Sequence, residues 1–257
     1  MIPCLTRHRA SGPNYVGSGN ASAHSAAGLI LDLYAAKADL GSSPGSNSDS
    51  TNRGTWTDLS GNNLNFGLSN FAYTTSSGWT GSNTSGDPDR LEFDGVDDNA
   101  NKAYTATLDL ATLTVDMWFY PRAFTTSGRI MTTSSSWTNM WGIIFLDTLG
   151  NIRLGTGSNV VGQCLETSTP PLTANQLTHL RAQFSTSVTD LKVWINNSPV
   201  TLISAGAGVS QAAGSMRISA KADASNYGKN GVISTRIYNR LLSDSEGTQN
   251  YNAGVTW

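Results

Sequence analysis

Charged residues are scarce in this chain of 257 residues, of which they make up 13%. That share is about half of the roughly 25% found in average soluble domains, and Ser, Thr, Asn and Gly take their place. The net charge is −2, and the 16 basic residues are scattered, with no run longer than the cluster at 7–9. Because a nucleic-acid binder needs a basic stripe to neutralise phosphates, the sequence argues against that class of partner.

Cysteine and histidine are also rare. Cys4 and Cys164 are too few for a disulfide framework, and Cys164 is interpreted as a small buried residue of a strand. His8 and His24 lie near the start of the chain, and His179 is interpreted as a structural strand residue. With these three histidines no Ser–His–Asp arrangement suggests itself, and no His-Glu-x-x-His motif occurs, so the sequence predicts neither nucleophilic nor zinc chemistry.

Long hydrophobic runs are absent. Nothing approaches the roughly 18 apolar residues of a membrane span, and the first residues lack the charged-then-apolar order of a signal peptide. The neutral composition nevertheless suits an extracellular surface. A protein that is assembled into a virus particle in a bacterial cytoplasm, and meets the outside only after lysis, would satisfy both observations.

Two regions differ in composition. Residues 1–27 have almost no apolar periodicity and predict an N-terminal arm, disordered or extended, that cannot fold alone. Residues 28–257 carry strand-like segments separated by turn residues and predict one domain.

The clearest strand signal is the segment Leu113–Tyr120, in which apolar residues alternate with others at the period of two that is typical of a half-buried strand. Pro121 is expected to end it, because proline lacks the amide hydrogen that a ladder needs. Further strands are expected at 28–34, 90–94, 141–147, 151–155, 177–185, 190–196, 215–220 and 232–239. Only one helix is expected, of a turn or two, after the capping-box spacing of Ser243 and Glu246. This pattern favours an all-β sandwich or barrel.

Several segments occur in an order that resembles a known family. They are Gly28–Tyr34, Trp56–Asn62, Leu91–Asp98, Leu113–Tyr120, Val193–Asn197 and Gly231–Glu246. The chain resembles the laminin-G-like, concanavalin A-like jelly-roll superfamily, of the kind found in bacteriophage structural proteins and bacterial surface proteins. The resemblance implies a sandwich of two antiparallel sheets over about residues 28–254. It implies no single function, because such folds serve as lectins, adhesion modules, glycosidases and capsid or tail modules.

One segment is similar to a catalytic motif. Glycosidases of this fold carry Glu-x-Asp-x-x-Glu on a strand, and here Glu92 and Asp94 take the first two positions. A retaining mechanism needs two carboxyl groups about 5 Å apart. Asp97 stands where the acid glutamate belongs, and Gly95 interrupts the strand. We therefore predict that the chain is not an enzyme.

Asp94, Asp97 and Asp98 could instead bind calcium, a hard cation that takes several oxygen ligands. Asp-Gly-Val-Asp-Asp is also ordinary turn chemistry, so no cofactor is required and both interpretations stay open.

Tryptophan is the other candidate ligand contact. Trp56, Trp137 and Trp141 lie in or beside loops rich in Ser, Thr, Asn and Gly. Aromatic rings exposed among polar groups are used to contact sugars or proteins. The alternative is that these rings cap the ends of the sandwich.

The leading hypothesis is therefore a non-enzymatic bacteriophage virion protein: a capsid decoration, head-fibre or tail-associated module. It would be located in the virion, as a homo-oligomer or in symmetric copies, with the arm at 1–27 bound to other virion proteins. The alternative is a carbohydrate-binding lectin or adhesin module for host-surface glycans, and a glycoside hydrolase comes third.

Overall fold

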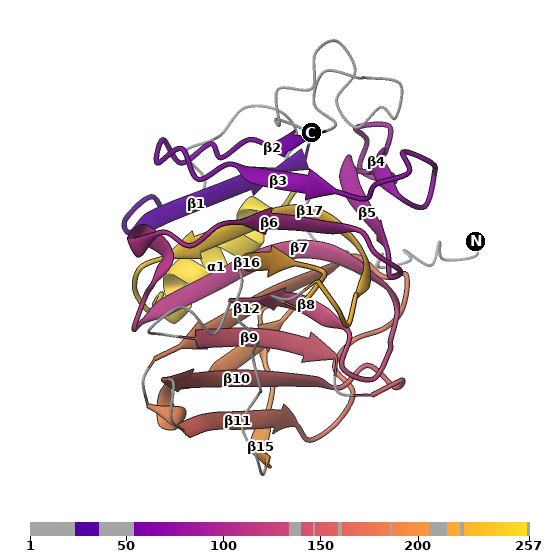
Figure 1. The fold of residues 1–257 in the computed structure, drawn as a ribbon. Coiled ribbons are helices and arrows are strands. Elements are labelled where there is room, and N and C mark those ends of the chain that lie inside the picture. The colour runs from indigo at the N-terminus through magenta and orange to yellow at the C-terminus, as the bar shows by residue number, and fades with distance from the viewer. Residues whose placement is uncertain are drawn as a thin grey trace, which may run out of the picture.

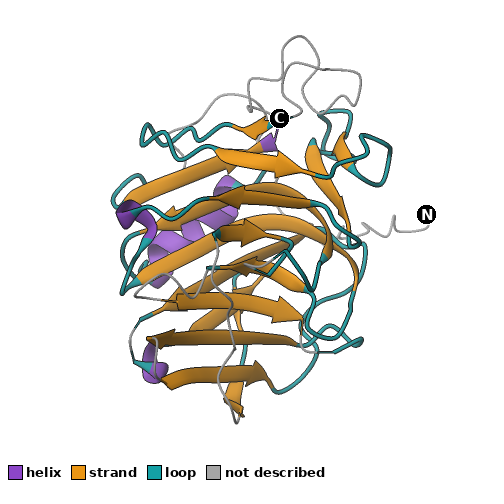
Figure 2. Ribbon diagram, in the orientation of Figure 1, coloured by secondary structure: helices purple, strands orange, loops and turns teal. Residues whose placement is uncertain are grey.

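The computed structural model describes residues 24–35, 54–133, 140–145, 147–158, 161–185, 187–205, 215–221 and 224–255. In these ranges strands dominate, and α1 (Asp244–Ala253) is the one α-helix (Figure 2). No helix in the described part of the chain is long and apolar enough to cross a membrane. The all-β class expected from the sequence is confirmed.

The strands form two antiparallel sheets. Sheet A has the order β14-β13-β12-β7-β17-β5-β4, with β1 paired to β17, and sheet B has the order β15-β11-β10-β9-β8-β16-β6-β3-β2. The strands of sheet A are β1 (Leu29–Tyr34), β4 (Gly78–Thr80), β5 (Arg90–Asp94), β7 (Leu113–Ala123), β12 (Thr178–Phe184), β13 (Lys192–Ile195), β14 (Ser198–Pro199) and β17 (Lys229–Tyr238). Those of sheet B are β2 (Thr55–Trp56), β3 (Phe66–Ser69), β6 (Asn99–Lys102), β8 (Arg129–Thr132), β9 (Met140–Phe145), β10 (Ile152–Ser158), β11 (Val161–Thr167), β15 (Leu202–Ala205) and β16 (Met216–Ile218). Figure 1 shows sheet B in front, running from β3 near the top to β15 at the bottom.

Each of the nine expected strands is present, but Pro121 does not end β7, which continues to Ala123. The Pro121 carbonyl accepts a hydrogen bond from the Asn175 amide at 2.7 Å. Because the nitrogen and carbonyl of a strand residue point to the same side, the proline nitrogen faces the chain just outside the end of β12. No ladder bond is lost there, so the strand tolerates the proline.

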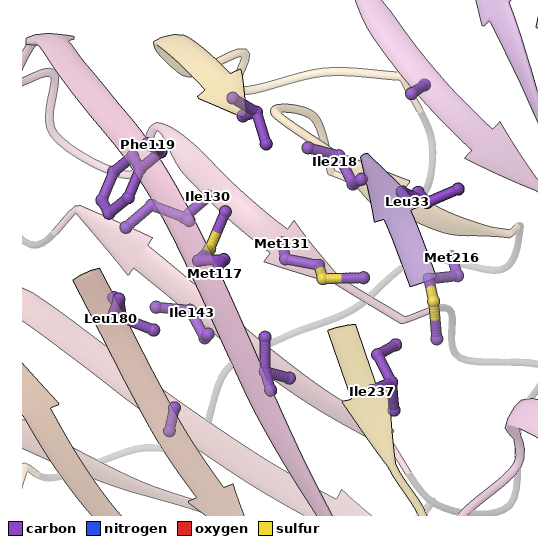
Figure 3. Close-up of a cluster of buried hydrophobic side chains, with 14 of the residues drawn as sticks. Leu33, Met117, Phe119, Ile130, Met131, Ile143, Leu180, Met216, Ile218 and Ile237 are labelled. Atoms are coloured by element: carbon purple, nitrogen blue, oxygen red, sulfur yellow. The ribbon is translucent and has the colours of Figure 1, made fainter. Parts of the chain in front are cut away.

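The core lies between the sheets. Figure 3 shows Met117 and Phe119 of β7 and Leu180 of β12 among Ile130 and Ile143 of sheet B. The prediction that Leu113–Tyr120 is half-buried was wrong, because alternate residues on its other face are buried as well. Trp118 on that face belongs to a second apolar cluster, outside sheet A.

Helix α1 covers part of this outer face, meaning the face of sheet A that points away from sheet B. The expected capping box is confirmed: the Ser243 hydroxyl accepts from the Glu246 amide, and the Glu246 carboxylate accepts from the Ser243 amide. The helix has 10 residues and is longer than the turn or two expected. Its polar side chains find partners on the sheet, since Asn250 donates to Asp116 at 3.3 Å and to the Tyr238 hydroxyl at 3.0 Å.

The packed chain begins before the expected boundary at residue 28. The Ser25 amide donates to Asn250 Oδ1 at 2.9 Å, and Arg240 Nε donates to the Ala27 carbonyl at 3.0 Å. Residues 24–27 are therefore held against the sandwich, and the rest of the expected arm, residues 1–23, lies outside the described part.

Candidate functional site

A polar cluster lies on the outer face of sheet A, at the ends of β5 and β7 that α1 does not cover. We call Arg90, Glu92, Tyr120, Arg122 and Asn175 the outer-face cluster. Along β5, Leu91 and Phe93 enter the core, so the period of two turns Arg90 and Glu92 to the opposite face. The cluster thus follows directly from how β5 alternates.

Gly231 leaves room for this cluster. In register across the sheet, Tyr120 of β7 lies opposite Gly231 of β17, Gly231 lies opposite Glu92, and Glu92 lies opposite Gly78 of β4. A Cβ atom added at Gly231 would come within 2.8 Å of Glu92 Oε1. The missing side chain lets the carboxylate lie across β17 toward the side chains of β7.

Glu92 is 5% exposed, and its carboxylate is held by two guanidinium groups. Arg90 Nε donates to it at 2.6 Å, and Arg122 donates through Nε at 3.1 Å and through Nη2. Arg90 also pairs with Asp87 at 2.6 Å, and Arg122 Nη1 donates to Asn175 Oδ1 at 3.3 Å. Two guanidinium groups thus meet two carboxylates, so the cluster is rigid and close to neutral.

Tyr120 supplies the aromatic member of the cluster. Its half-buried ring has the guanidinium carbon of Arg122 at 4.6 Å and that of Arg90 at 5.6 Å from its centroid. Burial raises the pKa of Tyr120 above its usual value of 10.0. The hydroxyl therefore stays protonated at neutral pH and can donate a hydrogen bond. Such a ring beside amide and guanidinium groups can stack on a sugar and hydrogen-bond its hydroxyls.

Asp94 follows Glu92 on the same face of β5. Asp94 Oδ1 accepts from the Val96 amide at 2.7 Å and from the Asp97 amide at 3.4 Å, so it is engaged by its own turn. Glu92 shares both its oxygens with arginines. Of the segment that is similar to the glycosidase motif, Asp94 thus stabilises a turn and Glu92 belongs to an ion-pair network.

Asp94, Asp97 and Asp98 lie together, with one ligand oxygen of each within 4.8 Å of the others, and calcium binding there stays a prediction. Asp98 is buried and accepts from the Ser77 hydroxyl at 3.0 Å and from the Asp94 amide at 2.9 Å. Burial raises the pKa of Asp98 to about 6, and the charges of Asp94 and Asp97 add to the rise. Oxygen donors suit calcium, but both Asp98 oxygens and Asp94 Oδ1 already accept hydrogen bonds, so a cation would need further ligands.

The tryptophan prediction was wrong for the two rings that the structure describes. Trp56 is 0% exposed and Trp141 is 2% exposed, so neither offers a ring face to a ligand. Trp56 packs edge-on against Trp79, and Trp141 packs against Phe184. Both residues lie in strands of sheet B, β2 and β9, and their rings belong to the main core. Trp137 lies outside the described residues.

His179 is a structural residue, as predicted. It is buried, and its Nε2 lies 3.1 Å from Asp116 Oδ2 beneath α1. Burial would raise the pKa of Asp116, but the nearby His179 and Arg236 outweigh burial and lower it. Asp116 and His179 thus lie between sheet A and α1, where Asp116 also contacts Asn250 of the helix.

Residues 94–246 match the family model of the concanavalin A-like lectin/glucanases superfamily. The match spans more than half of the chain, and the chain belongs to this superfamily. No curated protein matches the sequence.

Solved structures share the fold at low identity. Domain 4 of AbnA, a GH43 extracellular arabinanase from Geobacillus stearothermophilus solved with arabinotriose, superposes with a TM-score of 0.58 and 17% identity over 88% of this chain and 98% of that one. The binding domain of Paraclostridial Mosquitocidal Protein 1 superposes with a TM-score of 0.57 and 16% sequence identity. The match covers 88% of this chain and 52% of that one. Trypanosoma rangeli sialidase superposes with a TM-score of 0.54 and 13% sequence identity over 88% of this chain. The chain spans only 33% of the length of the sialidase. These likenesses show that the chains share one fold.

Proposed function

We propose that this chain is a non-catalytic carbohydrate-binding domain whose ligand contacts the outer-face cluster. The observation that carries the proposal is the half-buried Tyr120 ring, which lies beside two guanidinium groups fixed by one carboxylate. Sugar sites combine a ring for stacking with hydrogen-bonding groups that are already held in place, because pre-organisation lowers the entropic cost of binding.

A neutral sugar fits this cluster best. The arginine charges of Arg90 and Arg122 are matched by Glu92 and Asp87, so an anion gains little. The side chain of Asn175 adds an amide beside Arg122. The arabinanase domain that shares this fold was solved with arabinotriose, which supports a sugar as the ligand.

The absence of catalysis rests on the same geometry. Retaining and inverting glycosidases both need one carboxyl group that gives up a proton and a second that attacks or activates water. Both oxygens of Glu92 accept hydrogen bonds from Arg90 and Arg122, and Asp94 caps its turn. Neither is set up as the acid.

The test is a panel of neutral and acidic polysaccharides, assayed in parallel for binding by affinity electrophoresis and for release of reducing ends. We expect retardation by at least one neutral glycan and no hydrolysis. Tyr120→Ala should abolish the retardation. The matched control is Tyr104→Ala, because Tyr104 is 51% exposed and follows β6 in sheet B. Hydrolysis that Glu92→Gln removes would contradict the proposal.

A second candidate function is display of this domain on a bacteriophage particle, with the virion as its location and other virion proteins as partners. The resemblance of segments such as Gly231–Glu246 to phage structural proteins supports it, as does the low charge of the chain. Residues 24–27 lie against α1, so an anchor at 1–23 would join the sandwich there.

Co-sedimentation with particles that lack the endogenous copy tests this second candidate. Deletion of residues 1–23 should leave the melting transition unchanged and abolish incorporation in symmetric copies. Equal incorporation of the truncated and full-length proteins would place the attachment on the sandwich. Failure of both proteins to sediment would remove the virion assignment.

A further inference from the structure

A second tyrosine lies close to the outer-face cluster, on helix α1. The ring of Tyr251 stacks on that of Trp118 in β7, with 5.7 Å between the ring centroids and 15° between the ring planes. The Tyr251 ring also lies 5.5 Å from the ring of His179, which faces Trp118 in the register of β7 and β12. Tyr251 therefore packs onto the outer face of sheet A, and it stays partly exposed.

Tyr120 and Tyr251 border the same strip of this face. Trp118 and Tyr120 are two residues apart on one side of β7, so their Cα atoms are separated by roughly 6.6 Å along the strand. Tyr120, Leu177 and Tyr251 all pack, partly exposed, against the apolar cluster that contains Trp118. A glycan unit that contacts Tyr120 would therefore leave Tyr251 within reach of a neighbouring unit of the same chain.

Each tyrosine has an exposed amide group nearby. Asn175 Oδ1 accepts from Arg122 at 3.3 Å, and Asn196 Oδ1 accepts from the backbone amide of His179 at 2.9 Å. Among the residues that the structure describes, neither the Nδ2 group of Asn196 nor the Tyr251 hydroxyl has a hydrogen-bond partner. Near Tyr251 the outer face thus repeats the combination of the cluster, an aromatic ring with an amide that is already oriented.

We propose that the glycan site continues from Tyr120 to Tyr251, and that its ligand is a polysaccharide chain with several units in contact rather than a mono- or disaccharide. This inference rests on the proposed function, because the outer-face cluster would hold the first units. Tyr251 and Asn196 would hold the units that follow, by stacking and by hydrogen bonds to sugar hydroxyls. Leu177, Asn196 and Tyr251 are uncharged, which agrees with a neutral glycan.

The test uses the neutral polysaccharide that retards the full chain most strongly in affinity electrophoresis, hydrolysed to a disaccharide and a hexasaccharide. In isothermal titration, the wild type should bind the hexasaccharide about tenfold more tightly than the disaccharide. Tyr251→Ala should bind the disaccharide as the wild type does and lose about tenfold in affinity for the hexasaccharide, as expected for one aromatic contact. Thermal melting checks that this variant is folded.

Asn196→Asp tests the same part of the strip without removing a packed ring. Aspartate keeps an oxygen for the His179 amide and tolerates the φ of 50° at this position, but it lacks the Nδ2 donor. Hexasaccharide binding should weaken about fivefold, and disaccharide binding should not change. The matched control is Asn226→Asp, because Asn226 is also exposed, has a φ of 51° and lies between β16 and β17.

Equal affinity of the wild type for the two sugars, or hexasaccharide binding that neither variant weakens, would overturn the extension. So would an equal loss for both sugars in Tyr251→Ala, because the ring would then support the site rather than contact a further unit. The proposed function would still stand in these cases if Tyr120→Ala abolished binding. If Tyr251→Ala does not fold, Asn196→Asp decides alone. Retardation by no neutral glycan would overturn both the proposed function and its extension.

Discussion

The carboxylate of Glu92 occupies the space that a side chain of Gly231 would need. An added Cβ would come within 2.8 Å of Oε1 and 2.9 Å of Oε2. We expect Gly231→Ala to push the carboxylate away from Arg122, to lower the free energy of unfolding by about 1–3 kcal/mol, and to weaken glycan binding. Chemical denaturation and affinity electrophoresis measure the two effects.

Gly67→Ala is the control for this change, because Gly67 lies in β3 of sheet B and an added Cβ would meet nothing closer than 3.8 Å. Its effect on glycan binding should be nil. If Gly231→Ala binds glycan as tightly as the wild type, the position of Glu92 does not matter to the site.

The buried Asp116 should be among the most sensitive positions of the fold. It pairs with His179 at 3.1 Å and accepts from Asn250 at 3.3 Å. Asp116→Ala would leave His179 and the nearby Arg236 without this charge, and we expect a loss of about 3 kcal/mol or more in the free energy of unfolding. Asp97→Ala, at an exposed position, should change stability by less than about 0.5 kcal/mol. Equal effects in urea denaturation would show that the pair does not hold α1 in place.

Acid should loosen the first packed residues. Burial, followed by the charge of Arg236, lowers the pKa of His24 from 6.5 to about 3. Since the folded state resists protonation, the packing of His24 is stable above pH 6.5 and is weakened progressively as the pH falls from 6.5 toward 3. Hydrogen exchange of the Ser25 amide, which donates to Asn250, reports this locally.

A local measurement is needed because Asp98 acts in the opposite direction. Burial raises its pKa to about 6, so the folded state gains stability as the pH falls from 6 to 3.8. His24→Gln should remove the acid dependence of Ser25 exchange. Exchange that is equally slow at pH 7 and pH 4 in the wild type would contradict the assigned burial of His24.

Calcium binding to the acidic turn makes a separate prediction. If Asp94, Asp97 and Asp98 hold the ion, millimolar Ca²⁺ should raise the melting temperature, and Asp97→Asn should abolish the shift. The shift should shrink as the pH falls below about 6, where Asp98 takes up its proton. Identical melting curves in calcium and in chelator would leave the three residues as a turn.

Local patterns predicted much of the fold. The strand at Leu113–Tyr120 and the capping box of Ser243 and Glu246 were predicted from neighbours in sequence, and both were found in the structure. The length of α1 was underestimated because it depends on Asp116 and other partners in sheet A, which sequence spacing does not reveal.

The candidate site could not be predicted in the same way. Glu92 drew attention as a member of a catalytic motif, but its partners Tyr120 and Arg122 come from another strand, and the register of β5, β17 and β7 brings them together. The burial of the Trp56 and Trp141 rings could not be predicted either, because polar neighbours in sequence do not determine whether a ring points into the core.

The central claim, a glycan site on the outer face, is tested most directly by mapping amide chemical-shift changes as the glycan selected by electrophoresis is titrated into isotopically labelled protein. We predict that the largest changes fall at Tyr120, Arg122, Asn175 and Gly231, and that Tyr120→Ala removes them. Changes confined to sheet B would contradict the assignment of the outer-face cluster.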